Sequence, residues 1–544
     1  MRTFVDDIAA HAAREPGRIA VTAPDGDLTY AELSARVDTL AAELCARGAR
    51  AETVCAVAVE RGADAVVAMA AVVRSGAAFL VLDVEQPPLR LAALVRSGRA
   101  DLLLTASDLA ARLELPVPGR PVLLDRAEAG ADAVAPPEPP GRRTLAYVSH
   151  TSGTTGEPGA VLVEHGGLDS YLRFVARDYC LGPDTVALQV APLGYDASVR
   201  DTFAPLLAGG RLVVVPRSAL LRPAEFGATV RTHGVTALLS VTPSFLSFLA
   251  GQPDASELLA GVQVVVSSGE SLRPFLTAGG RTVVHGELIN QYGPTECTMT
   301  STRYAVPRDP DTAADLIGTP IDGVVVRLLD SGLAPVPDGT VGEICIGGAG
   351  VARGYQGLPA RTAERFVPDP LGPPGARLYR TGDLARTGPG GLRYLGRSDR
   401  QVKIRGYRVD PAEVEGALLA RPGVTGAVVT SDTDDRGRVF LVAHVAGDLA
   451  DTPDAALRAH LAATLPPHLM PRRFVRIAEM PTTRGGKADR RALTHAGDGP
   501  GAAPVPSAPA VSATVASAPV GSASVASAPV GSAAAPAAPS GARR

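Results

Sequence analysis

The sequence predicts an α/β protein: a large N-terminal domain of packed, mostly parallel sheets with helices, followed by a small mobile α+β domain. Three observations predict this fold class. Helical and strand-like segments alternate through most of the 544 residues, the strand-like segments are short and rich in β-branched residues, and charged residues cluster near residue 396. Alternation on this scale is typical of sheets covered by helices on their faces, and the length allows two or more domains.

The first predicted element is an amphipathic helix within residues 1–17, which is acidic and lacks the apolar core of a signal peptide. A second helix is predicted over residues 29–48, where apolar residues recur at helical spacing and Gly48 ends the pattern. Short β-branched runs then predict strands buried in a parallel sheet. These runs are residues 52–59, 211–216, 237–242 and 262–268.

The region that follows Gly396 predicts the smaller α+β unit. Its predicted helices are residues 413–420 and 454–465, and its predicted strands are residues 425–430 and 438–446. After about residue 495 the chain is rich in Ala, Pro, Ser and Gly and repeats the unit VASAPVGSA, which indicates a disordered tail. We therefore predict a core domain over 1–398, a small mobile domain over 399–497 and a tail over 498–544.

Composition narrows the class of protein. Hydrophobic residues make up 46% and charged residues 20%, as in a soluble globular protein. The net charge of −3 gives no broad basic field, so neither nucleic acid nor a membrane is predicted as a partner. Apolar runs are too short to span a bilayer. The five cysteines are odd in number and form no CxxC pair, which favours a reducing compartment without zinc and a cytoplasmic location.

One loop has the composition of an anion-binding turn. The stretch HTSGTTGEPGA (150–160) connects the strand-like segments 145–149 and 160–165, so it is not a Walker A loop, which opens a helix. Its glycines allow backbone N–H groups to converge on an anion, and its hydroxyl groups add donors; a plain hairpin turn is the alternative. The loop contains no cation, because Gly159 stands where phosphate loops usually place lysine.

Ten motifs occur in a fixed order between residues 4 and 495. They are LTYAEL (28–33), VVRSGAAFLVLD (72–83), TSGTTGEP (151–158), YDAS (195–198), NQYGPTE (290–296), GEICIGGAGVARGY (342–355), YRTGDL (379–384), GRSDRQVKIRGYR (396–408), LPPHLMP (465–471) and RGGKADR (484–490). Together they resemble the adenylation domains of nonribosomal peptide synthetases, which belong to the adenylate-forming enzymes with acyl-CoA synthetases and luciferases.

The resemblance implies a two-step reaction that uses ATP and Mg²⁺. An amino acid is first joined to AMP with release of pyrophosphate, and the acyl group then passes to the pantetheine thiol of a carrier protein. No HHxxxDG condensation motif and no GG[HD]S carrier motif is present. We therefore expect a free-standing enzyme that meets its carrier protein in trans. Some relatives also need a small helper protein of the MbtH type, and the sequence does not decide whether this chain needs one.

The resemblance also implies roles for individual residues. Asp383 accepts the ribose hydroxyls, Tyr292 packs against adenine, Glu296 holds Mg²⁺, and Lys487 is the catalytic cation that bridges carboxylate and α-phosphate. Asp399 is the hinge about which the small domain rotates, bringing the loop around Gly406 into the site. The implied ATP-binding residues are Thr151, Ser152, Gly153, Thr154, Thr155, Gly156, Gly269, Asn290, Tyr292, Gly293, Thr295, Glu296, Asp383, Arg397 and Lys487.

Asp196 indicates an amino acid substrate, because relatives that activate amino acids pair an aspartate at this position with the amino group. Read from the residues alone, Asp196 is a helix N-cap. Arg200 points to a substrate carboxylate, and we predict an acidic or small polar amino acid, α or β; alternatively Arg200 pairs with Asp201 or faces solvent. The implied pocket residues are Asp196, Ala197, Arg200, Ser244, Val266, Ser268, Gln291, Met299 and Thr300.

The loop departs from the family pattern at its end. Relatives continue with Pro-Lys-Gly, whereas this chain has Pro158, Gly159 and Ala160. The other residues needed for nucleotide chemistry are present, so we predict an active enzyme with weaker ATP binding. Two alternatives stay open: an acyl- or aryl-CoA ligase that uses free CoA, and a non-catalytic scaffold.

Overall fold

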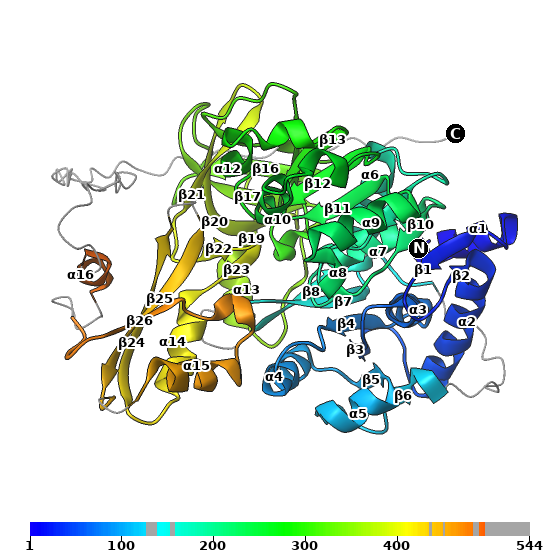
Figure 1. Cartoon of the computed structure of the whole chain (residues 1–544), viewed down its shortest axis with the longest axis horizontal. Coiled ribbons are helices and arrows are strands. Elements are labelled where there is room, and N and C mark those ends of the chain that lie inside the picture. The colour runs from blue at the N-terminus through cyan, green and yellow to red at the C-terminus, as the bar shows by residue number, and fades with distance from the viewer. Residues whose placement is uncertain (127–138, 153–157, 435–437, 450–451, 482–488, 496–544) are drawn as a thin grey trace, which may run out of the picture. The chain divides into compact units, whose positions relative to one another are not determined.

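The computed structural model describes residues 1–126, 139–152, 158–434, 438–449, 452–481 and 489–495. These residues fall within one compact unit that extends from Met1 to His495. Two large sheets, a short hairpin and a three-stranded sheet make up its strands (Figure 1). The α/β class with a large sheet-rich N-terminal part and a smaller C-terminal part is thereby confirmed.

The larger sheet has fourteen strands, with parallel pairing in its middle and antiparallel pairing towards both ends. The antiparallel part begins where β13 pairs with β14, because short connections replace crossover helices from that point on. The strands run in the order β16 (Val324–Leu329), β17 (Gly342–Gly348), β20 (Arg377–Gly388), β21 (Gly391–Arg397), β15 (Asp315–Pro320), β14 (Thr302–Val306), β13 (Glu287–Tyr292), β12 (Val264–Ser268), β11 (Ala237–Val241), β9 (Val186–Leu188), β10 (Arg211–Val213), β1 (Ile19–Thr22) and β2 (Leu28–Thr29), with β19 (Phe366–Pro368) beside β20.

The second sheet carries the glycine-rich loop between two of its strands. Strands β7 and β8 pair antiparallel, with Thr151 opposite Gly159, so the loop does join strand to strand as predicted. Its strand order is β18 (Gly354–Tyr355), β8 (Gly159–Glu164), β7 (Leu145–Thr151), β4 (Ala78–Leu82), β3 (Val54–Ala58), β5 (Leu102–Thr105) and β6 (Val122–Leu123).

Helices cover the faces of both sheets. Helix α2 begins at the predicted place because Thr29 and Glu32 form a capping box, in which each side chain accepts from the other residue's backbone N–H. Helix α3 is apolar almost all round and is buried along nearly its whole length. The helices of this part are α1 (Phe4–Arg14), α2 (Tyr30–Ala46), α3 (Ala63–Arg74), α4 (Pro88–Gly98), α5 (Ser107–Leu113), α6 (His165–Asp178), α7 (Ala197–Leu207), α8 (Arg217–Leu220), α9 (Pro223–His233), α10 (Pro243–Ala250), α11 (Ala255–Leu258), α12 (Arg273–Thr277) and α13 (Pro359–Arg365).

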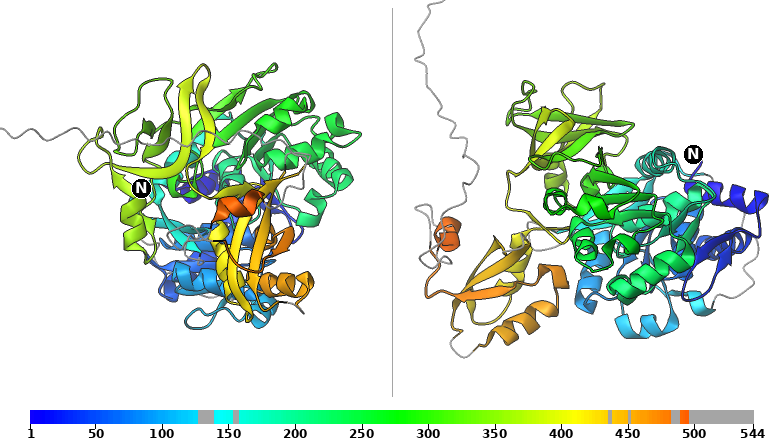
Figure 2. Two further views of the ribbon diagram at one scale, coloured as in Figure 1. Left: turned by 90° about the vertical axis from the view of Figure 1, so that its left-hand side faces the viewer. Right: turned by 45° about the horizontal axis from the view of Figure 1, so that its top comes forward.

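The C-terminal part has its own apolar core. The hairpin β22–β23 leads into helix α14, which packs against β24 and contacts α15 (Figure 2). Apolar residues of these elements, among them Val414, Leu418, Val429 and Leu457, form one buried cluster. The elements are β22 (Val402–Ile404), β23 (Tyr407–Val409), α14 (Pro411–Leu419), β24 (Val424–Thr433), β25 (Val439–Gly447), α15 (Asp454–Ala462), β26 (Arg473–Arg476) and α16 (Arg490–His495).

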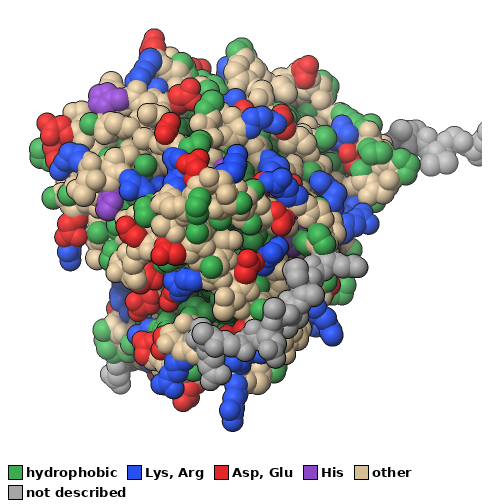
Figure 3. Space-filling model, turned by 90° about the vertical axis from the view of Figure 1, so that its right-hand side faces the viewer, with side chains coloured by type: hydrophobic (Ala, Val, Ile, Leu, Met, Phe, Trp, Pro, Cys, Tyr) green, Lys and Arg blue, Asp and Glu red, His purple; other side chains and the backbone are tan. Residues whose placement is uncertain are grey.

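The predicted helices and strands named above all occur, with ends shifted by a few residues. The domain boundary at 398–399 stays a prediction, and the predicted tail at 498–544 lies outside the described residues. The face in Figure 3 carries basic and acidic side chains interspersed rather than in blocks of one sign. Within the part of the chain that the structure describes, no helix has the length and apolar character needed to cross a membrane.

Candidate active site

The site is built around the ends of β12 and β13, two parallel strands of the larger sheet. Ligands of α/β sheets bind outside the carboxyl ends of such strands. Register pairing places Ser268 beside Gln291 at these ends, and Gly269 and Tyr292 follow at the same edge. A pocket opens there. Its lining residues are Gly269, Glu270, Ser271, Asn290, Gln291, Tyr292, Gly293, Asp315, Ile317, Tyr394 and Lys403.

Two predicted ATP-binding residues hold the backbone of this pocket in place. The Asn290 Nδ2 donates to the backbone oxygen of Leu316, 2.8 Å away, which ties β13 to β15. A Cβ on Gly293 would lie 2.5 Å from the Cα of Thr300, so only glycine fits where the chain turns. Asn290 and Gly293 therefore shape the pocket wall, as the motif NQYGPTE suggests.

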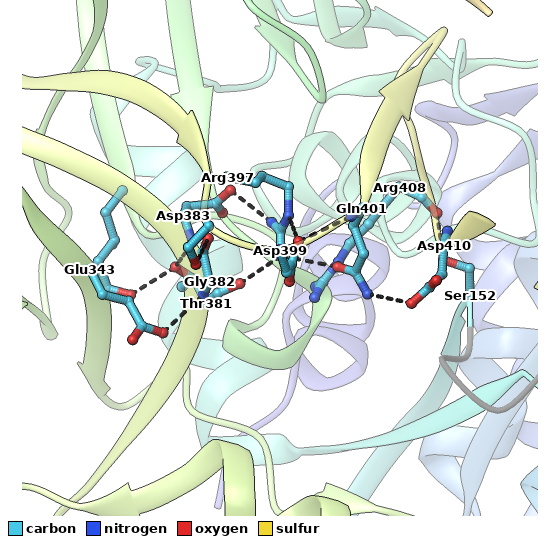
Figure 4. Close-up of polar contacts among 12 residues, drawn as sticks. Ser152, Glu343, Thr381, Gly382, Asp383, Arg397, Asp399, Gln401, Arg408 and Asp410 are labelled. Atoms are coloured by element: carbon cyan, nitrogen blue, oxygen red, sulfur yellow. Dashed lines mark hydrogen bonds and ion pairs between the residues drawn. The ribbon is translucent and has the colours of Figure 1, made fainter. Parts of the chain in front are cut away.

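The predicted ribose carboxylate, Asp383, accepts hydrogen bonds from two tyrosines that line this pocket. It also accepts one from Arg397 (Figure 4). Tyr292 donates to Oδ2 at 2.6 Å, while Arg397 and Tyr394 donate to Oδ1 at 2.7 and 3.0 Å. Cross-strand pairing of β20 and β21 sets Asp383 opposite Arg397. The structure thus brings together three of the predicted ATP-binding residues, Tyr292, Asp383 and Arg397.

Asp399, the predicted hinge, is held by the same arginine. Arg397 donates from Nε to Asp399 Oδ1 at 2.6 Å and from Nη2 to Oδ2 at 2.8 Å (Figure 4). Burial alone would raise the pKa of Asp399, but the hydrogen bonds and charge of Arg397 hold that pKa below its usual value. The forked pairing fixes the backbone between β21 and the hairpin β22–β23.

The predicted Mg²⁺ carboxylate, Glu296, is fully buried on a short 3-10 turn (Thr295–Cys297) and is paired with a cation of the chain itself. Arg408 Nη1 lies 3.1 Å from Glu296 Oε2, and the Tyr355 hydroxyl donates to Oε1 at 2.8 Å. Burial opposes ionisation, yet the charge of Arg408 holds the pKa of Glu296 below its ordinary value. An ionised carboxylate suits Mg²⁺, but in this arrangement Arg408 must leave before a metal ion can take its place.

Hairpin β22–β23 reaches into the site and makes several of its contacts. The Gly406 N–H donates to Glu270 Oε1 at 2.8 Å, and a Cβ on Gly269 would lie 3.1 Å from the Gly406 Cα. Gly269, a predicted ATP-binding residue, therefore lies directly against the turn of the hairpin, and its role in nucleotide binding stays a prediction. Ser152 also contacts this segment, donating to the Arg408 backbone oxygen at 2.9 Å and accepting from the Asp410 N–H at 3.0 Å (Figure 4).

Lys403 is a site residue that the motif analysis did not single out. Its Nζ lies over the rings of Tyr292 and Tyr394, at 5.4 and 5.8 Å from their centroids, within the pocket. Burial lowers the pKa of Lys403, against the opposing charge of Asp383. The signal was present in the sequence, because the motif GRSDRQVKIRGYR contains this lysine.

Asp196 stands at the first position before helix α7, but its side chain makes no capping hydrogen bond. Its Oδ2 is buried and has no hydrogen-bond partner among the described residues. Burial raises the pKa of Asp196, opposed by Thr295 and Arg200. The geometry therefore disfavours the N-cap interpretation, since an acceptor that caps nothing is left for another group.

Arg200 is buried with 1% of its surface exposed, and its hydrogen-bond partners are neutral. It donates to Ser240 Oγ from Nε at 3.0 Å and from Nη2 at 2.8 Å, and to the Tyr171 hydroxyl from Nη1 at 2.9 Å. Asp201 instead accepts the backbone N–H groups of residues 190 and 191. Within the described residues Arg200 forms no ion pair, so neither alternative, pairing with Asp201 or facing solvent, fits.

The other predicted pocket residues mostly gather around Arg200. Gln291 Oε1 accepts from Arg200 Nη1 and from Thr300 Oγ1, and Ser268 Oγ lies 3.5 Å from Nη2. Ala197 contributes its backbone oxygen, which accepts from Ser240. Val266, on β12, and Met299 are both buried, and Met299 has a left-handed backbone with φ 71°.

Ser244 does not join this cluster. Its backbone N–H donates to Glu270 at 2.9 Å and its hydroxyl contacts Thr242 Oγ1 at 3.2 Å. Ser240, on the preceding strand, takes the position beside Arg200, and Tyr171 of helix α6 completes the cluster. Sequence reasoning missed both. Spacing from the motif pointed to the helix start rather than to the strand before it, and Tyr171 belongs to no motif.

Some predicted residues cannot be placed. Gly153, Thr154, Thr155, Gly156 and the predicted catalytic Lys487 lie outside the described residues. Thr151 is described, and its Oγ1 is buried without a hydrogen-bond partner in the described part of the chain. Within that part, no group of three or more His, Cys, Asp or Glu residues is placed to hold a metal ion.

Comparison with known proteins identifies the class that this fold and site define. A model of the AMP-binding enzyme family matches residues 8–356, and a model of the AMP-binding enzyme C-terminal domain matches residues 413–487. The chain therefore belongs to the AMP-binding enzymes, a family of adenylate-forming ligases.

Individual relatives refine this assignment. The chain is 38% identical over 506 residues to phosphinothricin tripeptide synthetase PhsC of Streptomyces viridochromogenes. This match covers 90% of the chain and 45% of PhsC. It is 34% identical over 521 residues to tyrocidine synthase 3 of Brevibacillus parabrevis, and this match covers 93% of the chain and 8% of that protein. The chain thus spans less than half of either protein.

A solved structure supports the same assignment. The chain superposes on holo-PA1221 with a TM-score of 0.78 at 30% identity, and the match covers 91% of this chain and 84% of that chain. PA1221 is a nonribosomal peptide synthetase protein that contains adenylation and PCP domains, and its structure holds a vinylsulfonamide inhibitor. The amide bond synthetase McbA of Marinactinospora thermotolerans, at 24% identity and a TM-score of 0.78, shares the fold. The chain is an adenylate-forming domain of the nonribosomal peptide synthetase type.

Proposed function

We propose that this protein activates an amino acid with ATP and then loads it onto a carrier protein. A carboxylate oxygen of the amino acid attacks the α-phosphorus of ATP, the bond to the β-phosphate oxygen breaks, and pyrophosphate leaves. The phosphopantetheine thiol of a carrier protein, supplied in trans in the cytoplasm, then attacks the acyl carbonyl and AMP leaves. The holo-PA1221 likeness, a protein with adenylation and PCP domains, supports the second step.

The pocket at β12–β13 is the proposed nucleotide site. Tyr292 and Lys403 line it, and Asp383, which is hydrogen-bonded to Tyr292, would offer the carboxylate for the ribose hydroxyls. Mg²⁺, when bound at Glu296, would offset charge on the pyrophosphate. Lys487 remains the proposed catalytic cation and belongs to the proposed small domain of residues 399–497. After adenylation this domain would turn about Asp399, so that Lys487 leaves the active site and hairpin β22–β23 enters it.

Asp196 and Arg200 carry the substrate proposal, because neither side chain forms an ion pair at contact distance among the described residues. Asp196 has a buried oxygen without a partner, and Arg200 is buried among neutral hydroxyl and amide groups. A buried charge without a counter-charge is costly unless a ligand supplies one. An amino acid would place its ammonium group at Asp196 and a side-chain carboxylate at Arg200, so we propose an acidic amino acid, either α or β.

The test is amino-acid-dependent ATP–pyrophosphate exchange with Mg²⁺, run with and without an MbtH-type helper. We expect exchange with aspartate, glutamate or an acidic β-amino acid, and little with hydrophobic ones. Arg200→Met should lower kcat/KM for the acidic substrate by about 10²-fold, because a charge-assisted fork is lost. Arg177→Met is the matched control: Arg177 pairs with Asp322 and both side chains are more than half exposed.

Other outcomes would replace the proposal. Preference for a hydrophobic amino acid would remove the role given to Arg200. Transfer to free CoA in place of a carrier protein would favour the acyl-CoA ligase alternative. Failure to bind ATP, with folded protein, would favour the non-catalytic scaffold.

A further inference from the structure

The space beside Gly159 is occupied by a cation from another part of the chain. A Cβ built on Gly159 would lie 2.8 Å from Nη1 and 3.5 Å from Cζ of Arg361. It would also lie 3.6 Å from Oγ1 of Thr151, the residue paired with Gly159 across β7 and β8. A side chain at position 159 would therefore begin too close to the guanidinium for the two to coexist without a shift.

The pairing of two strands brings Arg361 close to Gly159. Strand β18 pairs antiparallel with β8, setting Tyr355 opposite Val161, and helix α13 with Arg361 follows directly. The Arg361 guanidinium carbon lies 4.3 Å from the centroid of the Tyr355 ring. The hydroxyl of the same tyrosine donates to Glu296, the proposed metal ligand. One residue, Tyr355, thus contacts both the guanidinium and the metal carboxylate.

Two polar atoms beside Gly159 have no hydrogen-bond partner among the described residues. They are Nη1 of Arg361 and Oγ1 of Thr151, and both are buried. Buried donors are rarely left unpaired, because each costs the desolvation of that group. Both atoms lie within 4 Å of one point at the base of the glycine-rich loop, so a ligand that accepts hydrogen bonds there would satisfy both.

We propose that Arg361 binds the polyphosphate of ATP and supplies the positive charge that the loop lacks at Gly159. This inference rests on the proposed function, since it assigns a residue to the nucleotide site of the same reaction. An arginine suits the role because its guanidinium is always charged and presents paired donors to phosphate oxygens. Gly159 leaves room for the guanidinium in this position, because a Cβ there would force it to shift.

Equilibrium binding of ATP and of AMP to the whole chain separates this role from a structural one. Arg361→Met should weaken ATP binding about 10- to 100-fold, the loss expected for one charge-assisted contact, and leave AMP binding within about twofold. Arg361→Lys should keep most of the ATP affinity. Arg365→Met, on the same helix, is the matched control and should change neither. Equal losses for ATP and AMP, or unchanged ATP affinity, would overturn the proposal.

Moving the positive charge from position 361 to position 159 gives a second test. Gly159→Lys alone should not improve ATP binding, because its side chain meets Arg361. Gly159→Lys combined with Arg361→Met should restore ATP affinity to within a few-fold of the wild type, so that the two changes are strongly non-additive. Additive losses would contradict a shared phosphate site. The binding assay needs no amino acid, so silence in ATP–pyrophosphate exchange would remove the proposed function without touching this result.

Discussion

At the scale of single residues, the buried charged groups of the site are of two kinds: some form ion pairs, and others contact only neutral groups. Glu296 and Asp383 are matched by Arg408 and Arg397, and both ion pairs lie largely out of solvent. Arg200, by contrast, has neutral partners. Matched pairs hold the chain together, whereas an unmatched charge is available to a ligand.

The Glu296–Arg408 pair should be costly to break. Glu296 has no exposed surface and the Arg408 side chain is 17% exposed, so Arg408→Met leaves a carboxylate buried without its counter-charge. We expect the free energy of unfolding, measured by urea denaturation at pH 7, to fall by about 3 kcal/mol. The exposed pair of Arg177 and Asp322 provides the comparison, and Arg177→Met should cost about 1 kcal/mol or less. Equal losses in the two variants would contradict this account.

The residue scale is also where sequence reasoning had its limits. Tyr292, Asp383, Glu296 and Arg397 could be predicted as site residues from their motifs, because each motif is one short continuous stretch of sequence. Ser240 and Arg361 could not. Choosing Ser240 over Ser244 requires the point where β11 ends, and the contact of Arg361 with Gly159 depends on strands distant in sequence that pair only in the fold.

At the scale of elements, the pocket depends on how closely three antiparallel strands approach. Strand β15 lies between β14 and β21, and it contributes Asp315 and Ile317 to the pocket lining. A Cβ on Gly318 would lie 1.9 Å from the backbone oxygen of Arg303 on β14, and Gly318 has φ 74°. Sequence patterns identified the strands of the parallel part, where β-branched runs are continuous, but not this contact between backbones.

Gly318→Ala should therefore separate these strands and weaken the pocket. We expect a loss of about 2–4 kcal/mol in the free energy of unfolding, because backbone must move as well as adopt a strained conformation. Gly261→Ala isolates the conformational part, since Gly261 also has positive φ, 89°, but nothing lies within 4 Å of its Cβ position. That control should lose about 1 kcal/mol. AMP affinity, measured by calorimetry, should fall in Gly318→Ala only.

At the scale of the whole molecule, histidines that are buried or half-buried, and neutral when folded, occur in separate parts of the fold. Burial lowers the pKa of His150, at the start of the glycine-rich loop, to about 3, and that of His165, at the start of α6, to about 4. Burial also lowers the pKa of His468 to about 3, and its ring stacks on Tyr407 at 4.0 Å. In the unfolded chain each would bind a proton near pH 6.5.

These three groups make the stability of the whole chain sensitive to mild acid. Between about pH 6.5 and pH 4 the unfolded state binds more protons than the folded state, so the free energy of unfolding rises with pH across that window. The stabilisation is complete above pH 6.5 and is lost as the pH falls, by about 1–2 kcal/mol per histidine between pH 7 and 5. His468→Phe keeps a ring against Tyr407 and removes one titrating group, so urea denaturation from pH 7 to 5 should show a shallower loss. His285→Phe, at an exposed position, should keep the wild-type slope; a slope unchanged in His468→Phe would mean that this ring does not titrate on unfolding.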